Sequence, residues 1–181
     1  MDQGKKYYME IAARLQSKST TTILDTIKEL RHTGSPKHIP LIVALINENT
    51  APEIREAVHR FIIDLKSQEV VPVLVEEIEK GDFGEDLPQL LADCWGSGLN
   101  FSNHLPAFTD IFIKGNYQTS LEAFTTIEYS LQEANTQIKE ECIHLLQDRK
   151  DMITEEKNSL YVELLRILKN IPDVSSLKIS F

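Results

Sequence analysis

Apolar residues recur along most of the chain at the three- and four-residue spacing of a single helix face, and short polar or glycine-containing stretches separate the segments. No segment gives a convincing hairpin or strand–helix–strand pattern. The pattern therefore predicts an all-α protein with about ten helices. The expected helices cover residues 5–16, 20–32, 36–47, 51–65, 68–80, 85–95, 102–114, 119–132, 136–149 and 154–170.

Several turns carry residues that begin or end helices. The dipeptide Ser35-Pro36 is typical of a cap followed by the first helical position. Thr50, with Glu53 three residues later, has the spacing of a capping box. Gly81 is expected to end its helix in the left-handed conformation. The turn at residues 66–67 is so short that the helices on either side must be antiparallel neighbours.

One stretch of the chain is repeated. Residues 70–83 and 104–117 share a proline, a lysine, a glycine, an Asp or Asn and an aromatic residue in register. The offset is 34 residues, and a third copy begins 32 residues before the first, at residue 38. Self-similarity at this period indicates an array of helix pairs. A proline falls in the first turn of one helix in each copy, where backbone amides have no intrahelical partner: Pro40, Pro72 and Pro106.

Stacked helix pairs share a continuous core, because no single pair can bury its apolar stripe alone. We therefore expect one domain over residues 1–181, with a short extended or flexible tail at residues 172–181. The apolar stripes predict that the following side chains are buried: Ile54, Phe61, Ile62, Leu74, Ile78, Leu90, Phe108, Phe124 and Ile127.

Residues 38–65 resemble a HEAT repeat. The resemblance lies in the opening around Pro40, the polar turn that begins at Asn47, and Arg55 in the second helix. The two following helix pairs keep the proline and the turn but lack the arginine. In HEAT proteins the turn and the arginine help to align neighbouring repeats, so the resemblance implies this role for Asn47 and Arg55.

The resemblance implies a HEAT-like α-solenoid. Such a fold is a right-handed superhelix, here of about five antiparallel helix pairs, without a sheet of three or more strands. In HEAT proteins the second helix of each pair lines a concave groove. The resemblance therefore also implies a groove along the second helices of this chain.

Composition and charge limit the kinds of protein that this chain can be. The chain is 41% hydrophobic and 26% charged, as in ordinary globular proteins, and its net charge is −9. An acidic chain without a basic cluster repels nucleic-acid phosphates and anionic membrane surfaces. The N-terminus lacks an apolar signal-peptide core, no apolar run reaches the ~20 residues of a membrane span, and two cysteines suggest no disulfide framework. We therefore expect a cytoplasmic protein.

Motifs for catalysis, metal binding and cofactor binding are missing from the sequence. The five histidines and two cysteines lack the spacing of a metal site. The phosphate-binding and nucleophile motifs GxxxxGK[ST], GxGxxG and GxSxG do not occur. Cys94 and Cys142 fall on the apolar sides of their helices and are expected to be buried free thiols. The sequence therefore predicts no catalytic residue, no cofactor and no metal.

Polar residues lie opposite the apolar stripes of the second helices. If these helices line a groove, the carboxylates of Glu56, Asp86, Asp93 and Glu122 form an acidic ladder along it. The alternative is an ordinary solvated face. Trp95 and Tyr129 are interpreted as core or edge packing. The candidate partner-binding residues are Glu56, Arg60, Asp86, Gln89, Asp93, Glu122, Thr126 and Tyr129.

The leading functional hypothesis is a non-enzymatic scaffold or adaptor that binds a protein or peptide in its concave groove. An acidic groove favours a Lys/Arg-rich segment as the ligand. The protein is expected to be a monomer or weak dimer that binds neither nucleic acid nor membranes. Two alternatives stay open: a small lyase or modifying enzyme on the same scaffold, and a structural subunit that packs end to end.

Overall fold

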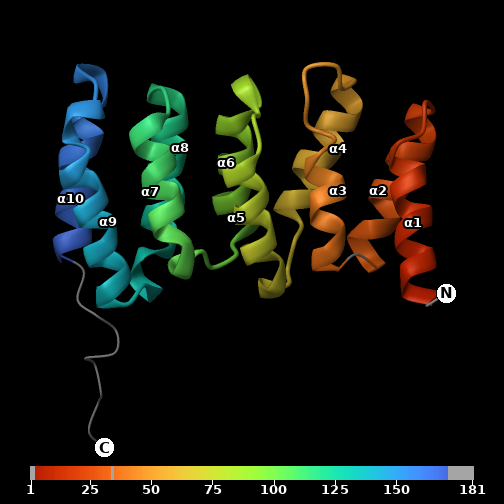
Figure 1. Cartoon of the computed structure of the whole chain (residues 1–181), viewed down its shortest axis with the longest axis horizontal. Coiled ribbons are helices and arrows are strands. Elements are labelled where there is room, and N and C mark those ends of the chain that lie inside the picture. Colours follow the sequence, from red (N-terminus) through yellow and green to blue (C-terminus); the bar gives the residue numbers. More distant parts are fainter. Residues whose placement is uncertain (1–2, 34, 171–181) are drawn as a thin grey trace, which may run out of the picture. The chain divides into compact units, whose positions relative to one another are not determined.

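A computed structural model describes residues 3–33 and 35–170 of the 181-residue chain. This described part is all helical, with ten α-helices, seven short 3-10 helices and no strand (Figure 1). The all-α prediction is therefore confirmed, whereas the expected tail at residues 172–181 lies outside the described residues. The α-helices are α1 (Gln3–Leu15), α2 (Thr20–Thr33), α3 (Ile39–Val43), α4 (Pro52–Ile63), α5 (Val71–Lys80), α6 (Leu87–Ser97), α7 (Leu105–Lys114), α8 (Tyr117–Ser130), α9 (Thr136–Asp148) and α10 (Asn158–Asn170).

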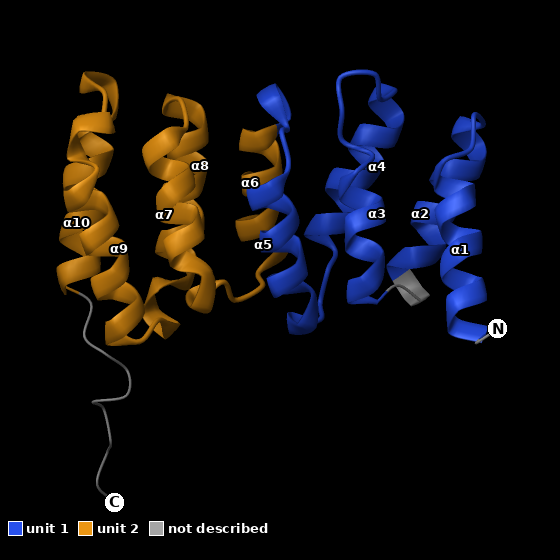
Figure 2. Ribbon diagram, viewed as in Figure 1, with its two compact units in different colours: residues 1–86 blue, residues 87–181 orange. Residues whose placement is uncertain are grey.

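Two compact units divide the chain after Asp86, as Figure 2 shows. In the first unit α1 packs on α2, α2 packs on α4, and α3 packs on α5. In the second unit α7 packs on α8 and α9, α6 packs on α8, and α10 packs on α9 and α8. When consecutive helices are grouped as pairs (α1 with α2, α3 with α4, and so on), the first helix of one pair contacts the first helix of the next pair within each unit. The second helices contact each other in the same way. The single domain expected over residues 1–181 stays a prediction.

The apolar stripes identify the core correctly. All the side chains predicted to be buried are 9% exposed or less. In the second unit the core contains the fully buried rings of Phe101 and Phe108, which meet edge to face with their centroids 5.4 Å apart. Such aromatic pairs contribute beyond the apolar area that they bury.

The first helices of three pairs, α3, α5 and α7, begin in the same way. Pro40, Pro72 and Pro106 are each the second residue of an α-helix, in α3, α5 and α7. A single 3-10 turn precedes each of these helices, at η1 (Pro36–His38), η2 (Gln68–Val70) and η4 (Ser102–His104). The predicted placement of the prolines in first turns is confirmed. Because the proline nitrogen occupies a position that needs no intrahelical donor, each helix loses no backbone hydrogen bond there.

The predicted capping box at Thr50 is wrong. The N-cap of α4 is Ala51, and no side chain caps this helix. The Thr50 hydroxyl instead donates a hydrogen bond to the carbonyl oxygen of Leu45, on the preceding turn. Threonine hydroxyls bond equally well to nearby backbone carbonyls, and this local alternative wins here.

Gly81 ends α5 as expected, but not in the left-handed conformation. Its backbone is extended, with φ −82° and ψ 152°, and Gly115 at the end of α7 is extended too, with φ −70° and ψ 163°. The reason for glycine is a close approach. A Cβ on Gly81 would collide with the ring of Phe83, and one on Gly115 would lie 2.7 Å from the side chain of Thr119. The repeated glycine therefore lets the chain fold back tightly after each helix.

His38 is buried in the first unit against α1. Its side chain is 1% exposed, and its ring contacts Tyr7 edge to face and Tyr8 in a stacked arrangement, with centroids 5.9 Å and 6.0 Å away. The backbone N–H of Ser35 donates to Nδ1 at 3.1 Å, so the proton of the neutral ring lies on Nε2. Nε2 is buried and has no hydrogen-bond partner in the described part of the chain. Burial lowers the pKa of His38, and the nearby charge of Lys37 lowers it further.

Acidification is expected to weaken the first unit through His38. Because the folded-state pKa is lowered, the unfolded chain binds this proton more tightly, and the free energy of unfolding falls as the pH drops from 7 through the ordinary pKa of about 6.5. Denaturation with urea at several pH values between 7 and 5 measures this slope. The His38→Asn variant should lack this part of the slope, whereas His144→Gln, at an exposed histidine, should retain it. An unchanged slope in His38→Asn would contradict the assignment.

Lys157 is a buried cation in the second unit. It lies in η7 (Glu155–Lys157), is 1% exposed, and its Nζ lies 5.8 Å from the centroid of the Phe112 ring. The Nζ donates to the carbonyl oxygens of Phe112, Ile113 and Gly115 at 3.1, 2.9 and 2.8 Å. These carbonyls belong to the C-terminal end of α7, which carries negative partial charge. Lys157 therefore joins the turn that leads into α10 to the C-terminal end of α7.

Candidate functional site

The first unit does not present an acidic surface at Glu56. Glu56 and Arg60 are both exposed and form an ion pair four residues apart on α4. They line a shallow cleft between α2 and α4 together with Lys28 and Arg31. Arg31 itself pairs with Asp64. Because both cations and carboxylates line this cleft, the surface around Glu56, the first member of the predicted ladder, has no excess of negative charge.

Asp86 is engaged by Arg55, the arginine singled out by the HEAT resemblance. Arg55 Nη1 donates to Asp86 Oδ1 at 3.0 Å, and Nη2 donates to the carbonyl oxygen of Asn47 at 3.1 Å. The arginine thereby connects the turn after α3 with the loop that follows α5. A cleft of about 710 Å³, with Phe83 in its lining, lies between this turn and this loop. The carboxylate of Asp86 is thus a neutralised partner within the first unit rather than an open ligand.

Asp93 is buried, which contradicts its expected place on an open face. Its side chain is 0% exposed and accepts a hydrogen bond at 3.1 Å from Nε2 of the exposed Gln89. The error arises because α6 is buried over a wider arc than one apolar stripe. Its buried residues are Leu90, Leu91, Asp93, Cys94 and Ser97. A stripe argument identifies one narrow buried face and assigns the remaining positions to solvent, so it fails for a helix whose buried face is wider than its apolar stripe.

Thr126 is buried as well, and its predicted exposure is wrong for a related reason. It is 0% exposed, and its Oγ1 lies 3.0 Å from the carbonyl oxygen of Glu122 and 3.3 Å from that of Leu91. The hydroxyl therefore donates at the contact between α8 and α6. Thr126 stabilises the packing of these helices and is not available to a partner.

Trp95 and Tyr129 form an aromatic pair across α6 and α8. Their rings stack with centroids 5.6 Å apart and planes at 29°, and Tyr129 is 66% exposed. Of the two placements expected for Tyr129, core and edge, the structure therefore shows packing at the edge. Glu122 supports the pair, because its Oε2 accepts from Trp95 Nε1 at 3.0 Å and its Oε1 accepts from Gln118 Nε2 at 3.1 Å. We call the side chains of Trp95, Gln118, Glu122, Tyr129 and Glu133 the α6–α8 face.

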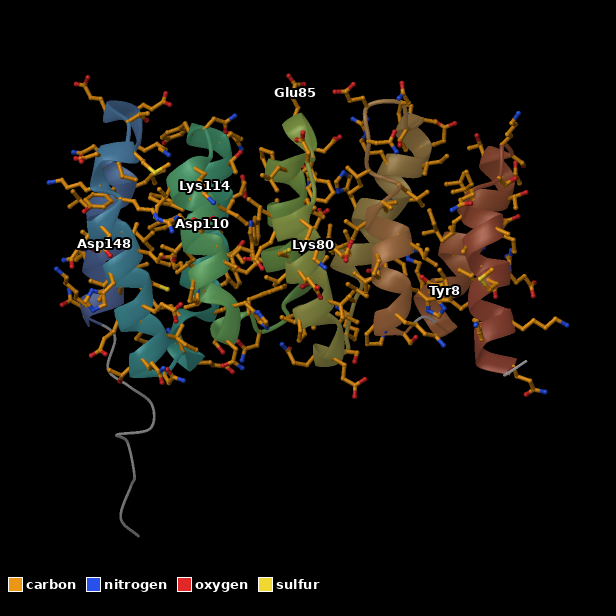
Figure 3. The ribbon with its side chains drawn as sticks, viewed as in Figure 1. Tyr8, Lys80, Glu85, Asp110, Lys114 and Asp148 are labelled. Atoms are coloured by element: carbon orange, nitrogen blue, oxygen red, sulfur yellow. The ribbon has the colours of Figure 1, made fainter. Side chains whose placement is uncertain are left out.

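Cations are scarce in this part of the second unit. Residues 87–138 contain five acidic residues, one lysine and no arginine. The lysine, Lys114, lies on α7 and pairs with Asp110 of the same helix at 2.6 Å (Figure 3). Neither Glu122 nor Glu133 forms an ion pair with a lysine or arginine in the described part of the chain. The α6–α8 face therefore carries two carboxylates that no lysine or arginine pairs with in the described residues.

A small cleft adjoins the exposed tyrosine where α6 and α8 end. It has a volume of about 80 Å³ and is lined by Gly98, Leu99, Asn100, Tyr129, Ser130 and Glu133. Asn100 Nδ2 donates to Glu133 Oε2, and the backbone N–H of Phe101 donates to Ser130 Oγ at 3.0 Å. Glu133 and the loop that makes this cleft were not singled out by the sequence, because neither carries a motif.

Both cysteines are buried, as predicted, and are 0% exposed. Burial raises the pKa of Cys142 to about 11. Burial also raises the pKa of Cys94, with a smaller contribution from the charge of Asp93. A thiol with a raised pKa has little thiolate at neutral pH and is a poor nucleophile.

Native labelling with a thiol reagent should therefore be slow at both cysteines. We expect Cys94 and Cys142 to react at rates limited by unfolding, because both the packing and the raised pKa values protect them. Absorbance after addition of an aromatic disulfide measures the rate, and the denatured protein, in which both thiols react at once, is the control. Rapid labelling of either residue in the native protein would reopen the enzymatic alternative.

The described residues contain no group of three or more His, Cys, Asp or Glu side chains that could hold a metal ion. Among the helices of the same residues, none combines the length and the hydropathy that a bilayer span requires. Comparison of the chain with protein-family models gave no match. Comparison with curated proteins gave no significant match.

Proposed function

We propose that the chain is a non-enzymatic interaction module that binds a basic segment of another protein on the α6–α8 face. The observation that carries this proposal is the stacked Trp95–Tyr129 pair with Tyr129 largely exposed. Exposed aromatic residues supply most of the binding energy at many protein interfaces. The hydrogen bonds that Glu122 accepts from Trp95 and Gln118 orient its carboxylate beside the rings.

The preferred partner is basic because the face attracts cations. A surface with unneutralised carboxylates raises the local concentration of positively charged ligands and speeds their association. Aromatic rings add attraction for lysine and arginine side chains that lie against them. Both features favour a Lys/Arg-rich segment over a neutral or an acidic one.

A HEAT-like right-handed solenoid is the arrangement that we propose for the helix pairs. It is supported by the repeated proline starts, by the contacts of second helices with second helices inside each unit, and by the bonds from Arg55 to Asn47 and Asp86. In HEAT proteins second helices line the concave side. In such a stack the α6–α8 face would belong to the groove.

Selection from a peptide display library tests the proposed function. The immobilised chain is offered random peptides of about 12 residues, and enriched sequences are synthesised and measured by fluorescence anisotropy. We expect enriched peptides to carry Lys and Arg, and their affinity to fall about tenfold in Tyr129→Ala, which corresponds to about 1.4 kcal/mol. Affinity should also fall as salt rises past about 0.15 M, where charges are screened over about 8 Å.

The matched control is Tyr117→Ala, which removes another exposed tyrosine from the same helix, at its first turn. This variant should bind the enriched peptides as the wild type does. Enrichment of sequences without net positive charge, or equal affinity of the wild type and Tyr129→Ala, would show that the α6–α8 face is not the binding site.

A further inference from the structure

We propose that the small cleft beside Tyr129 and Glu133 binds an arginine side chain of the partner. This inference rests on the proposed function and specifies one contact within it. Tyr129 belongs both to the α6–α8 aromatic pair and to the lining of the cleft. A partner that covers the aromatic pair therefore reaches the cleft without a second surface.

The cleft offers the two contacts that a guanidinium group requires. A guanidinium stacks on an aromatic ring, and Tyr129 provides an exposed ring at the rim. Its N–H groups also bind carboxylates through charge-assisted hydrogen bonds. Glu133 supplies the carboxylate, which accepts one bond from Asn100 on Oε2 and retains capacity for further donors.

The loop that closes the cleft is held by side chain–backbone bonds. The Leu99 N–H donates to Ser97 Oγ at 3.2 Å, and the Ser102 N–H donates to Asn100 Oδ1 at 2.8 Å. The loop begins at Gly98, whose φ of +71° suits glycine and leaves bare backbone beside the cleft. An ordered loop lowers the entropic cost of binding, because little has to be immobilised when the ligand arrives.

Arginine fits this arrangement better than lysine does. The planar guanidinium can lie flat on the Tyr129 ring while its edge points to a carboxylate, whereas an ammonium group is a compact point charge. The small volume of the cleft, about 80 Å³, suits the end of one side chain rather than a longer segment. The cleft should therefore discriminate between two ligands of equal charge.

Two probes of equal charge test the inference. Fluorescein-labelled hexa-arginine and hexa-lysine are titrated with the full chain, and binding is followed by anisotropy. We expect the wild type to bind hexa-arginine about fivefold more tightly, as one stacking and one charge-assisted contact would give. Glu133→Gln and Tyr129→Ala should each remove this preference. Amide shifts in NMR spectra should locate hexa-arginine at Leu99 and Asn100.

Glu128→Gln is the matched control, because Glu128 is an exposed carboxylate of α8 that does not line the cleft. It should keep the preference for arginine, and circular dichroism checks that every variant is folded. Equal binding of both probes, or a preference that survives Glu133→Gln, would overturn the arginine cleft and leave the proposed function standing. Failure of both probes to bind would overturn the inference together with the basic partner of the proposed function.

Discussion

Replacement of Asp93 by lysine should destabilise the protein by more than ~4 kcal/mol. The side chain is 0% exposed, so the longer lysine would overpack its surroundings and bury a charge at a place built for a carboxylate. The free energy of unfolding in urea, followed by circular dichroism, measures the effect. Asp93→Asn keeps the shape of the side chain and should cost much less, which gives a second value if Asp93→Lys does not fold.

Gln89→Lys is the control for Asp93→Lys. Gln89 is exposed one turn earlier on α6, so a lysine there stays in water and should change stability by less than ~0.5 kcal/mol. An unfolding curve for Asp93→Lys identical to that of the wild type would mean that Asp93 faces solvent, as the predicted acidic ladder requires. A large loss in both variants would instead point to a general intolerance of α6 to lysine.

Lys157→Met should cost about 2–4 kcal/mol of stability. Methionine fills a similar volume but donates no hydrogen bond, so the carbonyl of Ile113 loses its bond to the side chain, while that of Phe112 keeps only the Ser120 hydroxyl at 2.8 Å. Burial lowers the pKa of Lys157, which shows that desolvation opposes its charge, and the nearby Glu156 offsets part of this effect. The net loss is therefore smaller than three separate charged bonds would give.

Urea denaturation of Lys157→Met is compared with that of Lys114→Met. Lys114 is a lysine of α7 whose side chain is 60% exposed and makes one ion pair, so its replacement should change stability by less than ~0.5 kcal/mol. A Lys157→Met variant as stable as the wild type would mean that water or rearranged backbone satisfies the end of α7 without the lysine.

The presence of the helices and the identity of the core residues could be predicted from the sequence, because both depend on the spacing of apolar residues along the chain. The residues expected in the core, such as Phe61 and Ile127, are buried because a period of 3.6 residues marks the inward face without knowledge of the neighbours. The proline starts were predictable for a similar reason. Proline excludes itself from helix interiors, so Pro72 and Pro106 had to stand in first turns.

Side-chain environments that depend on a second or third helix could not be predicted. Asp93 and Thr126 looked like surface residues because their own helices give no sign of what covers their polar sides. The burial of Lys157 has no signal in the sequence, because the carbonyls that it binds lie more than forty residues earlier in the chain. Glu133 joins the candidate site only through the loop after α6. Contacts of this kind depend on tertiary packing, which produces no periodic pattern in the sequence.

Because the chain's one tryptophan stacks against Tyr129, its fluorescence can report on the α6–α8 face. Indole emission responds to hydration and to nearby charges, and here the indole N–H is bonded to the Glu122 carboxylate. Occupation of the α6–α8 face should therefore change the intrinsic fluorescence without any attached dye. The same emission reports only on the second unit, whereas circular dichroism reports on the helices of both units. Unfolding curves that coincide by the two methods would show that the units melt as one cooperative body, and separated curves would show that each melts alone.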